Sequence, residues 1–93
     1  MWTVLLWVYE NGQVLTERQA QAEGFVQALK TAGDGAITDI RSQLEYEGPK
    51  AADHHVSLIA QMRDTAQPLA PHGGTWIEDS TGEVMVQISY SLA

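Results

Sequence analysis

The sequence predicts an α+β fold: a mainly antiparallel sheet of four or five strands, with one or two helices packed on one face. Three observations predict this class. Strand-like apolar segments stand at both ends of the chain, a strong hairpin signal follows the first of them, and the middle carries amphipathic helical stripes. The 93 residues are expected to form a single domain, 1–93, large enough for one core.

The first strand is expected at residues 2–10, and both of its faces are apolar. One face carries Trp2, Val4, Leu6 and Val8, and the other carries Leu5, Trp7 and Tyr9. The Asn-Gly pair that follows favours a type I′ turn, because both residues tolerate a positive φ. The partner strand is expected to be short, from Gln13 to Leu15.

A helix is expected from about Glu17 to Ala32, packed on the sheet. Thr16 and Gln19 have the spacing of a capping box at its start. Apolar residues then recur at helical spacing, and those expected to face the core are Phe25, Val26 and Leu29. Gly33 is expected to end the helix in a left-handed conformation.

Two further segments have mixed patterns. Residues 36–47 alternate as a strand does, although several of their apolar residues also fit a helix; we expect the strand. Residues 50–65 fit a helix better than the alternative strand over 54–62.

A second hairpin is expected to close the chain. It follows a loop over 65–74 that is rich in proline and glycine, and it turns between Asp79 and Gly82. The last strand, over 83–92, alternates cleanly between apolar and polar residues, so one of its faces is expected to be buried.

The charge balance argues against two classes of partner. Twelve acidic residues stand against five basic ones, for a net charge of −7, and the basic residues are scattered singly. Phosphate backbones and anionic membranes attract clustered lysine and arginine, so we expect no direct nucleic-acid binding and no membrane attachment. The chain has no cysteine, and its N-terminal apolar run is too short to span a bilayer. These features predict a cytoplasmic protein.

Two adjacent histidines, His54 and His55, follow an aspartate and raise the question of a metal or acid–base site. In a helix or a strand the two rings point in different directions, and no ligand pair lies three or four residues apart. Only His72, in the loop, could complete a site. The sequence therefore predicts no metal and no cofactor, and leaves His54, His55 and His72 as candidates for ligand contact.

Three carboxylates, Glu78, Asp79 and Glu83, surround the expected second hairpin. They lack the spacing of a calcium loop, so we expect solvated side chains rather than a cation site. The final thirty residues contain no lysine or arginine. These acids predict a negative rim that would attract a basic protein partner.

The tryptophans predict self-association. Trp2 and Trp7 face opposite sides of the first strand, and two helices in so short a chain cover only one face of a sheet. The other face would expose more apolar surface than a soluble monomer normally does. We therefore expect a homodimer or small oligomer, with an interface drawn from Trp2, Leu5, Trp7 and Tyr9.

No nucleophile–base pair, metal spacing or carboxylate pair is evident, so we expect no catalytic residues. The predicted function is that of a small acidic interaction or assembly module. An alternative comes from the expected layout, which is similar to that of dimeric α/β-barrel proteins, whose paired sheets enclose a small-molecule cavity. That resemblance implies a small-molecule-binding protein or a small enzyme with a cavity near the histidines.

Overall fold

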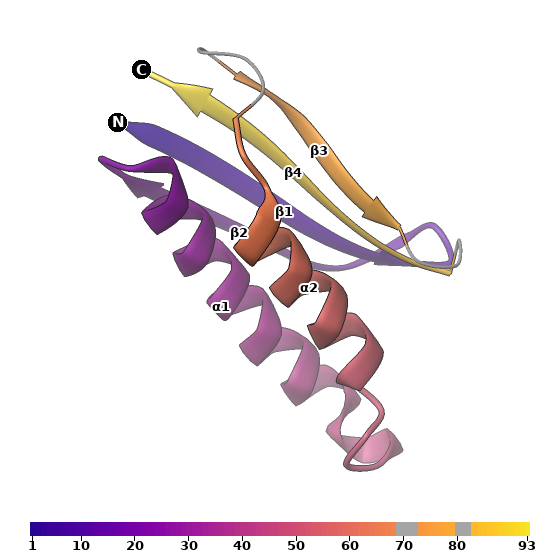
Figure 1. The fold of residues 1–93 in the computed structure, drawn as a ribbon. Coiled ribbons are helices and arrows are strands. Elements are labelled where there is room, and N and C mark those ends of the chain that lie inside the picture. Colours follow the sequence, from indigo (N-terminus) through magenta and orange to yellow (C-terminus); the bar gives the residue numbers. More distant parts are fainter. Residues whose placement is uncertain (69–72, 80–82) are drawn as a thin grey trace.

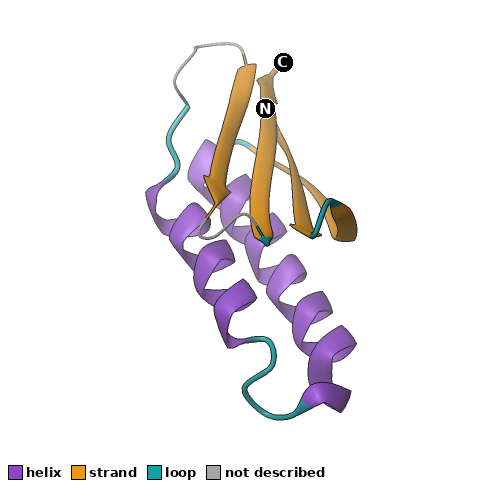
Figure 2. Ribbon diagram, turned by 90° about the vertical axis from the view of Figure 1, so that its right-hand side faces the viewer, coloured by secondary structure: helices purple, strands orange, loops and turns teal. Residues whose placement is uncertain are grey.

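The computed structural model describes residues 1–68, 73–79 and 83–93, of which residue 73 and residues 75–79 are described by their backbone only. The elements in chain order are β1 (Trp2–Glu10), β2 (Gln13–Ala22), α1 (Phe25–Leu44), the 3-10 turn η1 (Glu45–Glu47), α2 (Asp53–Thr65), β3 (Gly73–Asp79) and β4 (Val84–Leu92). The strands form one antiparallel sheet in the order β2-β1-β4-β3 (Figure 1). Both helices lie on one face of it (Figure 2). The predicted α+β class is confirmed.

The strands at the two ends of the chain form the centre of the sheet. β1 pairs with β4 along its whole length, from Trp2 opposite Leu92 to Glu10 opposite Val84. The turn after β1 has positive φ at both central residues, 51° at Asn11 and 80° at Gly12, as a type I′ turn requires. Alternate side chains of the two strands form the sheet half of the core: Val4, Leu6 and Val8 with Val84, Val86, Ile88 and Tyr90.

The segment after the turn differs from the prediction. The helix expected from about Glu17 to Ala32, with a capping box at Thr16 and Gln19, is wrong over its first half, because residues 13–22 form β2. The strand is defined by its antiparallel pairing with β1, and Thr16 and Ala20, which pair with the buried Val8 and Val4, are buried on the helix side of the sheet. Alanine and glutamine favour helices in isolation, but pairing with β1 outweighs that preference.

α1 then begins at Phe25 and continues past the point where it was expected to end. Gly33 lies inside the helix rather than at its end, and the strand expected at 36–47 is wrong because residues up to Leu44 are helical. Val26 was expected to face the core, yet it is 69% exposed. One continuous stripe is buried instead: Phe25, Ala28, Leu29, Ala32, Gly33, Ala36, Ile37 and Ile40.

Two glycines in the middle of α1 allow close packing. A Cβ atom at Gly33 would lie 3.2 Å from Cβ of Arg63 on α2, and one at Gly35 would lie 3.3 Å from the side chain of Arg18 on β2. Glycine costs about 1 kcal/mol relative to alanine within a helix. Here it lets a neighbouring helix and a side chain from the sheet approach the backbone of α1.

The remaining helix agrees with the prediction. α2 covers residues 53–65, within the 50–65 expected, and buries His55, Leu58, Ile59 and Met62 against α1 and the sheet. The expected turn between Asp79 and Gly82 lies outside the described residues.

A polar contact joins the edge strand to α1. Arg18 on β2 donates from Nε and Nη2 to the two carboxylate oxygens of Asp39, each at 2.6 Å. Thr16, which is nearly buried, donates to the same carboxylate at 2.7 Å. The hydrogen bond from Arg18 holds the pKa of Asp39 below its usual value, and that from Thr16 acts in the same direction, while partial burial opposes them.

The close approach at Gly33 makes a first prediction. Gly33→Leu places a branched side chain against Arg63, and we expect the free energy of unfolding to fall by about 1–3 kcal/mol. Thr31→Leu, on the exposed side of the same helix, is the matched control and should stay within about 0.5 kcal/mol of wild type. Urea unfolding measures both, and equal stabilities would contradict the close contact.

The Asp39 contact makes a second prediction. The pKa of Asp39 is lower in the folded state than in the unfolded chain, so the contact contributes stability above the unfolded value of about 3.9. That contribution is lost as the pH falls through the lowered folded pKa. Asp39→Asn should therefore destabilise the protein at neutral pH, and the difference from wild type should shrink between about pH 5 and pH 2.

Urea unfolding across this pH range measures the effect. Glu47→Gln, which removes an exposed carboxylate from η1, is the control and should keep the wild-type pH dependence. A difference between Asp39→Asn and wild type that stays constant with pH would contradict the assignment.

Candidate functional site

The face of the sheet opposite the helices is the main candidate site. Neither described helix covers it, as Figure 2 shows. Leu5, Trp7 and Tyr9 of β1 point to this side, because they alternate with the buried Val4, Leu6 and Val8. All three are half-buried by their strand neighbours. We call this side of β2, β1 and β4 the open face.

The strand register arranges the open face in rows across the sheet. Around Tyr9, the partners are Val14 on β2 and Met85 on β4, so the row nearest the β1–β2 turn is apolar. Val14 is 52% exposed and Met85 is half-buried. This row extends the apolar surface from one strand to three.

The other rows become progressively polar. Trp7 stands between Glu17 and Gln87, and Leu5 stands between Gln19 and Ser89. In the row farthest from the β1–β2 turn, Gln21 donates a hydrogen bond to Thr3 at 3.1 Å, and Ser91 is on the other side of Thr3. Among the described side chains in these rows, Glu17 is the one that carries a charge.

A β-bulge produces the apolar row. The register of β2 against β1 shifts between Val8 and Tyr9, with Thr16 opposite Val8 and Val14 opposite Tyr9. Leu15, the extra residue, packs against the core on the helix side, where its carbonyl accepts a hydrogen bond from Gln43 at 2.7 Å. Val14 is therefore placed on the open face, and the sequence pattern contained no signal for this shift.

Trp2 lies on the helix side, unlike the other residues of the predicted interface. Its ring centroid is 5.3 Å from that of Phe25 at the start of α1 and 6.2 Å from that of Tyr90 on β4. Phe25 and Tyr90 are 5.2 Å apart, in an edge-to-face arrangement. This aromatic cluster closes one end of the core, so Trp2 contributes to the packing of α1.

The two adjacent histidines diverge, as expected for a helix. His54 is exposed, and His55 is buried, with the ring centroids 6.3 Å apart. Nε2 of His55 lies 3.4 Å from the carboxylate of Glu10 at the end of β1. Neither ring nitrogen of His55 makes a hydrogen bond within the described part of the chain. His72, the third predicted ligand residue, lies outside the described residues.

The predicted acidic rim is described only in part. Glu78 and Asp79 belong to β3, where the backbone alone is described. Glu83 is exposed, and its carbonyl accepts a hydrogen bond from the backbone N–H of Asn11 at 2.7 Å. Across residues 1–68, 73–79 and 83–93, no group of three or more His, Cys, Asp or Glu side chains could hold a metal ion. The attraction of a basic partner stays a prediction.

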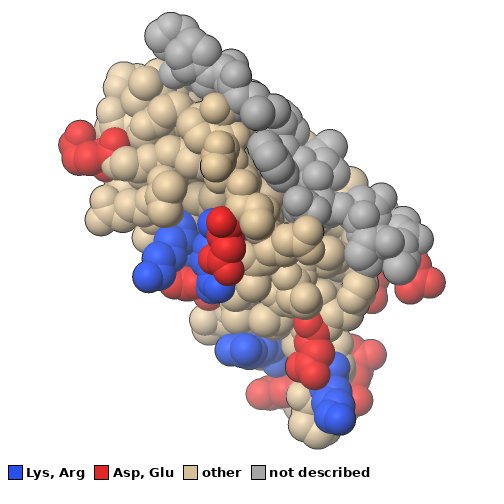
Figure 3. Space-filling model, in the orientation of Figure 1, with Lys and Arg blue, Asp and Glu red and all other residues tan. Residues whose placement is uncertain are grey.

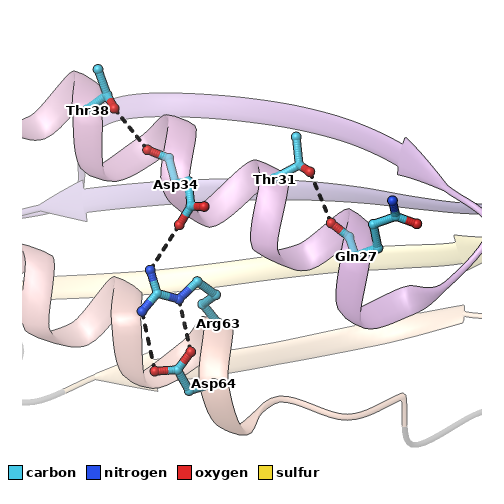
Figure 4. Close-up of polar contacts among 6 residues, drawn as sticks. All are labelled: Gln27, Thr31, Asp34, Thr38, Arg63 and Asp64. Carbon is cyan, nitrogen blue, oxygen red and sulfur yellow. Dashed lines mark hydrogen bonds and ion pairs between the residues drawn. The ribbon is translucent and has the colours of Figure 1, made fainter.

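Charged side chains gather over the two helices instead (Figure 3). Arg63 on α2 donates to Asp34 on α1 and to its neighbour Asp64, at 2.9 Å in each case (Figure 4). Hydrogen bonds to Asp64 and then Asp34 raise the pKa of Arg63, and the bond from Arg63 lowers the pKa of Asp64. Arg63 is thus engaged with carboxylates of its own chain, and nothing indicates that it binds an anion.

An open groove of about 530 Å³ runs beside this ion pair, between α1 and the end of α2. Its lining residues are Val26, Lys30, Asp34, Arg63, Asp64, Thr65, Ala66 and Gln67. The lining mixes both signs of charge with one large exposed apolar side chain, so it selects no particular ligand class. Neither described histidine lines this groove or the two smaller ones on the described surface.

Comparison with known proteins finds no match to a protein-family model, a curated protein or a solved structure. Within the described residues, no helix has the length and apolar character needed to cross a membrane.

The surroundings of His55 make a third prediction. A buried imidazole without hydrogen bonds carries an uncompensated desolvation cost, so we expect His55→Leu to raise the free energy of unfolding by about 1 kcal/mol. His54→Leu, one residue away but exposed, should change it by less than about 0.5 kcal/mol. Urea unfolding compares the two variants. A marked loss of stability in His55→Leu would contradict this prediction and would mean that the ring has a stabilising polar partner, either the Glu10 carboxylate 3.4 Å from Nε2 or a group outside the described residues.

Proposed function

We propose that this protein is a small non-catalytic assembly module that pairs with a second copy of itself through the open face. The observation that supports this proposal is the apolar surface at the centre of that face, which is formed by Leu5, Trp7, Tyr9, Val14 and Met85. Burial of large apolar side chains yields about 25 cal/mol per Å² of surface removed from water. A continuous apolar patch on a sheet is typical of a protein–protein contact.

The charge distribution supports a second copy as the partner. The chain carries a net charge of −7, so most ways of bringing two copies together oppose like charges. Within the rows of β2, β1 and β4 on the open face, Glu17 is the single charged residue, and the register of β3 places Asp79 opposite Met85 at the edge of the sheet. Two open faces therefore meet with little repulsion, and a two-fold dimer uses the same patch on both copies.

The alternative of a ligand-binding protein or small enzyme has less support. It places a cavity near the histidines, whereas neither His54 nor His55 lines any of the three grooves on the described surface, although Asp53, which precedes His54, lines one of them. Two paired sheets would still enclose a small-molecule cavity, which keeps the alternative compatible with a dimer. Co-purification of a small molecule with the dimer, detected by native mass spectrometry, would favour it.

Replacement of Trp7 tests the assembly. Sedimentation velocity should give a wild-type particle of about twice the 10.2 kDa chain mass. An interface tryptophan contributes about 2 kcal/mol in each copy, so Trp7→Ser should raise the dissociation constant of the dimer by roughly a thousandfold.

The matched control is Val26→Ser. Val26 is also a large exposed apolar residue, but it lies on α1, on the opposite side of the molecule. This variant should dimerise as wild type does. A wild-type protein that sediments as a single chain at several hundred micromolar would refute the proposed function.

A further inference from the structure

We infer how the two copies are arranged, an inference that rests on the proposed self-association. The two-fold axis runs close to the direction of β1, so that the β1 strands of the two copies face each other and run parallel. β2 of each copy then lies over β4 of the other. The partner is a second copy of this chain, and the arrangement is set by the rows of the open face.

Rotation about an axis along β1 brings equivalent rows together. Tyr9 meets its own copy, and on either side Val14 lies over Met85 of the other chain, which keeps the apolar row against itself. Gln19 lies over Ser89, and Gln21 lies over Ser91, which pairs the polar rows. This geometry agrees with aligned sheet packing, in which strand directions stay within about 30°.

The same rotation places Glu17 over Gln87 of the other chain. The charged residue of these rows then faces an amide, which can donate a hydrogen bond to a carboxylate. The contact occurs twice in the dimer because of the symmetry. Each carboxylate thus has a polar partner, and the two Glu17 side chains stay on opposite sides of the axis.

An axis across the strands fits less well. It would superpose β2 on β2 of the other copy, and with Trp7 at the centre it would bring the two Glu17 carboxylates together. Tyr9 would then face Leu5, but Val14 would face Gln19 and Met85 would face Ser89 of the other chain, so apolar side chains of the outer strands would cover polar ones. Like charges that face each other in an interface are unfavourable, and the first arrangement avoids this contact.

Charge substitutions on Glu17 and Gln87 distinguish the two arrangements. Gln87→Glu places a second carboxylate over Glu17 of the other chain, and we expect the dimer dissociation constant to rise about tenfold. The double variant Glu17→Lys with Gln87→Glu replaces that repulsion by an opposite-charge pair and should restore dimerisation to at least the wild-type strength. Sedimentation equilibrium at low and high salt measures the dissociation constants, and the differences should diminish at high salt.

Two controls isolate the contact between chains. Gln27→Glu adds the same charge at an exposed position of α1, away from the open face, and accounts for the change in net charge. Inside one chain Glu17 and Gln87 flank Trp7 from either side, roughly 9–10 Å apart by strand spacing. Thermal unfolding of the same variants in the monomeric Trp7→Ser background measures any effect within the chain.

The outcomes separate this inference from the proposed function. A wild-type protein that is monomeric would refute both the proposed self-association and the inferred arrangement. If Trp7→Ser dissociates the dimer while Gln87→Glu weakens it no more than Gln27→Glu does, that result would support the self-association and refute the arrangement. Failure of Glu17→Lys to rescue Gln87→Glu, with both variants folded, overturns it as well.

Discussion

The structure depends on one strand that is apolar on both of its faces. β1 lies at the centre of the sheet, paired with β2 on one side and β4 on the other. On the helix side Val4, Leu6 and Val8 are fully buried, and on the open side Leu5, Trp7 and Tyr9 are half-buried. Two helices fit on one face of a sheet this small, so the second apolar face of β1 has no cover from the described helices. The proposed assembly follows from this imbalance.

Close packing of α1 against α2 and β2 holds both helices on one face of the sheet. Gly33 lets α2 approach α1, and Gly35 leaves room for the side chain of Arg18. Asp34, between these two glycines, binds Arg63 on α2, so the same three residues provide both the space and a polar contact between the helices. Asp39, one and a half turns further along α1, binds Arg18 and Thr16 of β2. Both carboxylates of α1 therefore make contacts within the chain.

This use of charge leaves the two sides of the molecule unlike each other. The helix side carries ion pairs and exposed charged residues, which remain hydrated and oppose contact between two acidic chains. The open face carries glutamine, serine and threonine around its apolar centre. Such a surface can lose its water at a smaller cost than a charged one. The face that is easiest to desolvate is also the one that carries Leu5, Trp7 and Tyr9.

The sequence by itself determined the elements whose pattern is local and unambiguous. The apolar run of β1, the Asn-Gly turn after it and the alternation of β4 specify their structures from neighbouring residues, and the two-faced character of β1 already indicated Leu5, Trp7 and Tyr9. The stripe of α2 favoured a helix over the alternative strand at 54–62. Tertiary structure decided the rest. Residues 13–22 have helix-favouring side chains, but they form a strand because they pair with β1. The glycines of α1 suggest the end of a helix in the sequence, whereas in the structure they make room for Arg18 and Arg63. Two further features depend on contacts between residues far apart in the chain, which no local pattern encodes. One is the bulge that places Val14 on the open face, and the other is the aromatic cluster in which Trp2 packs on the helix side.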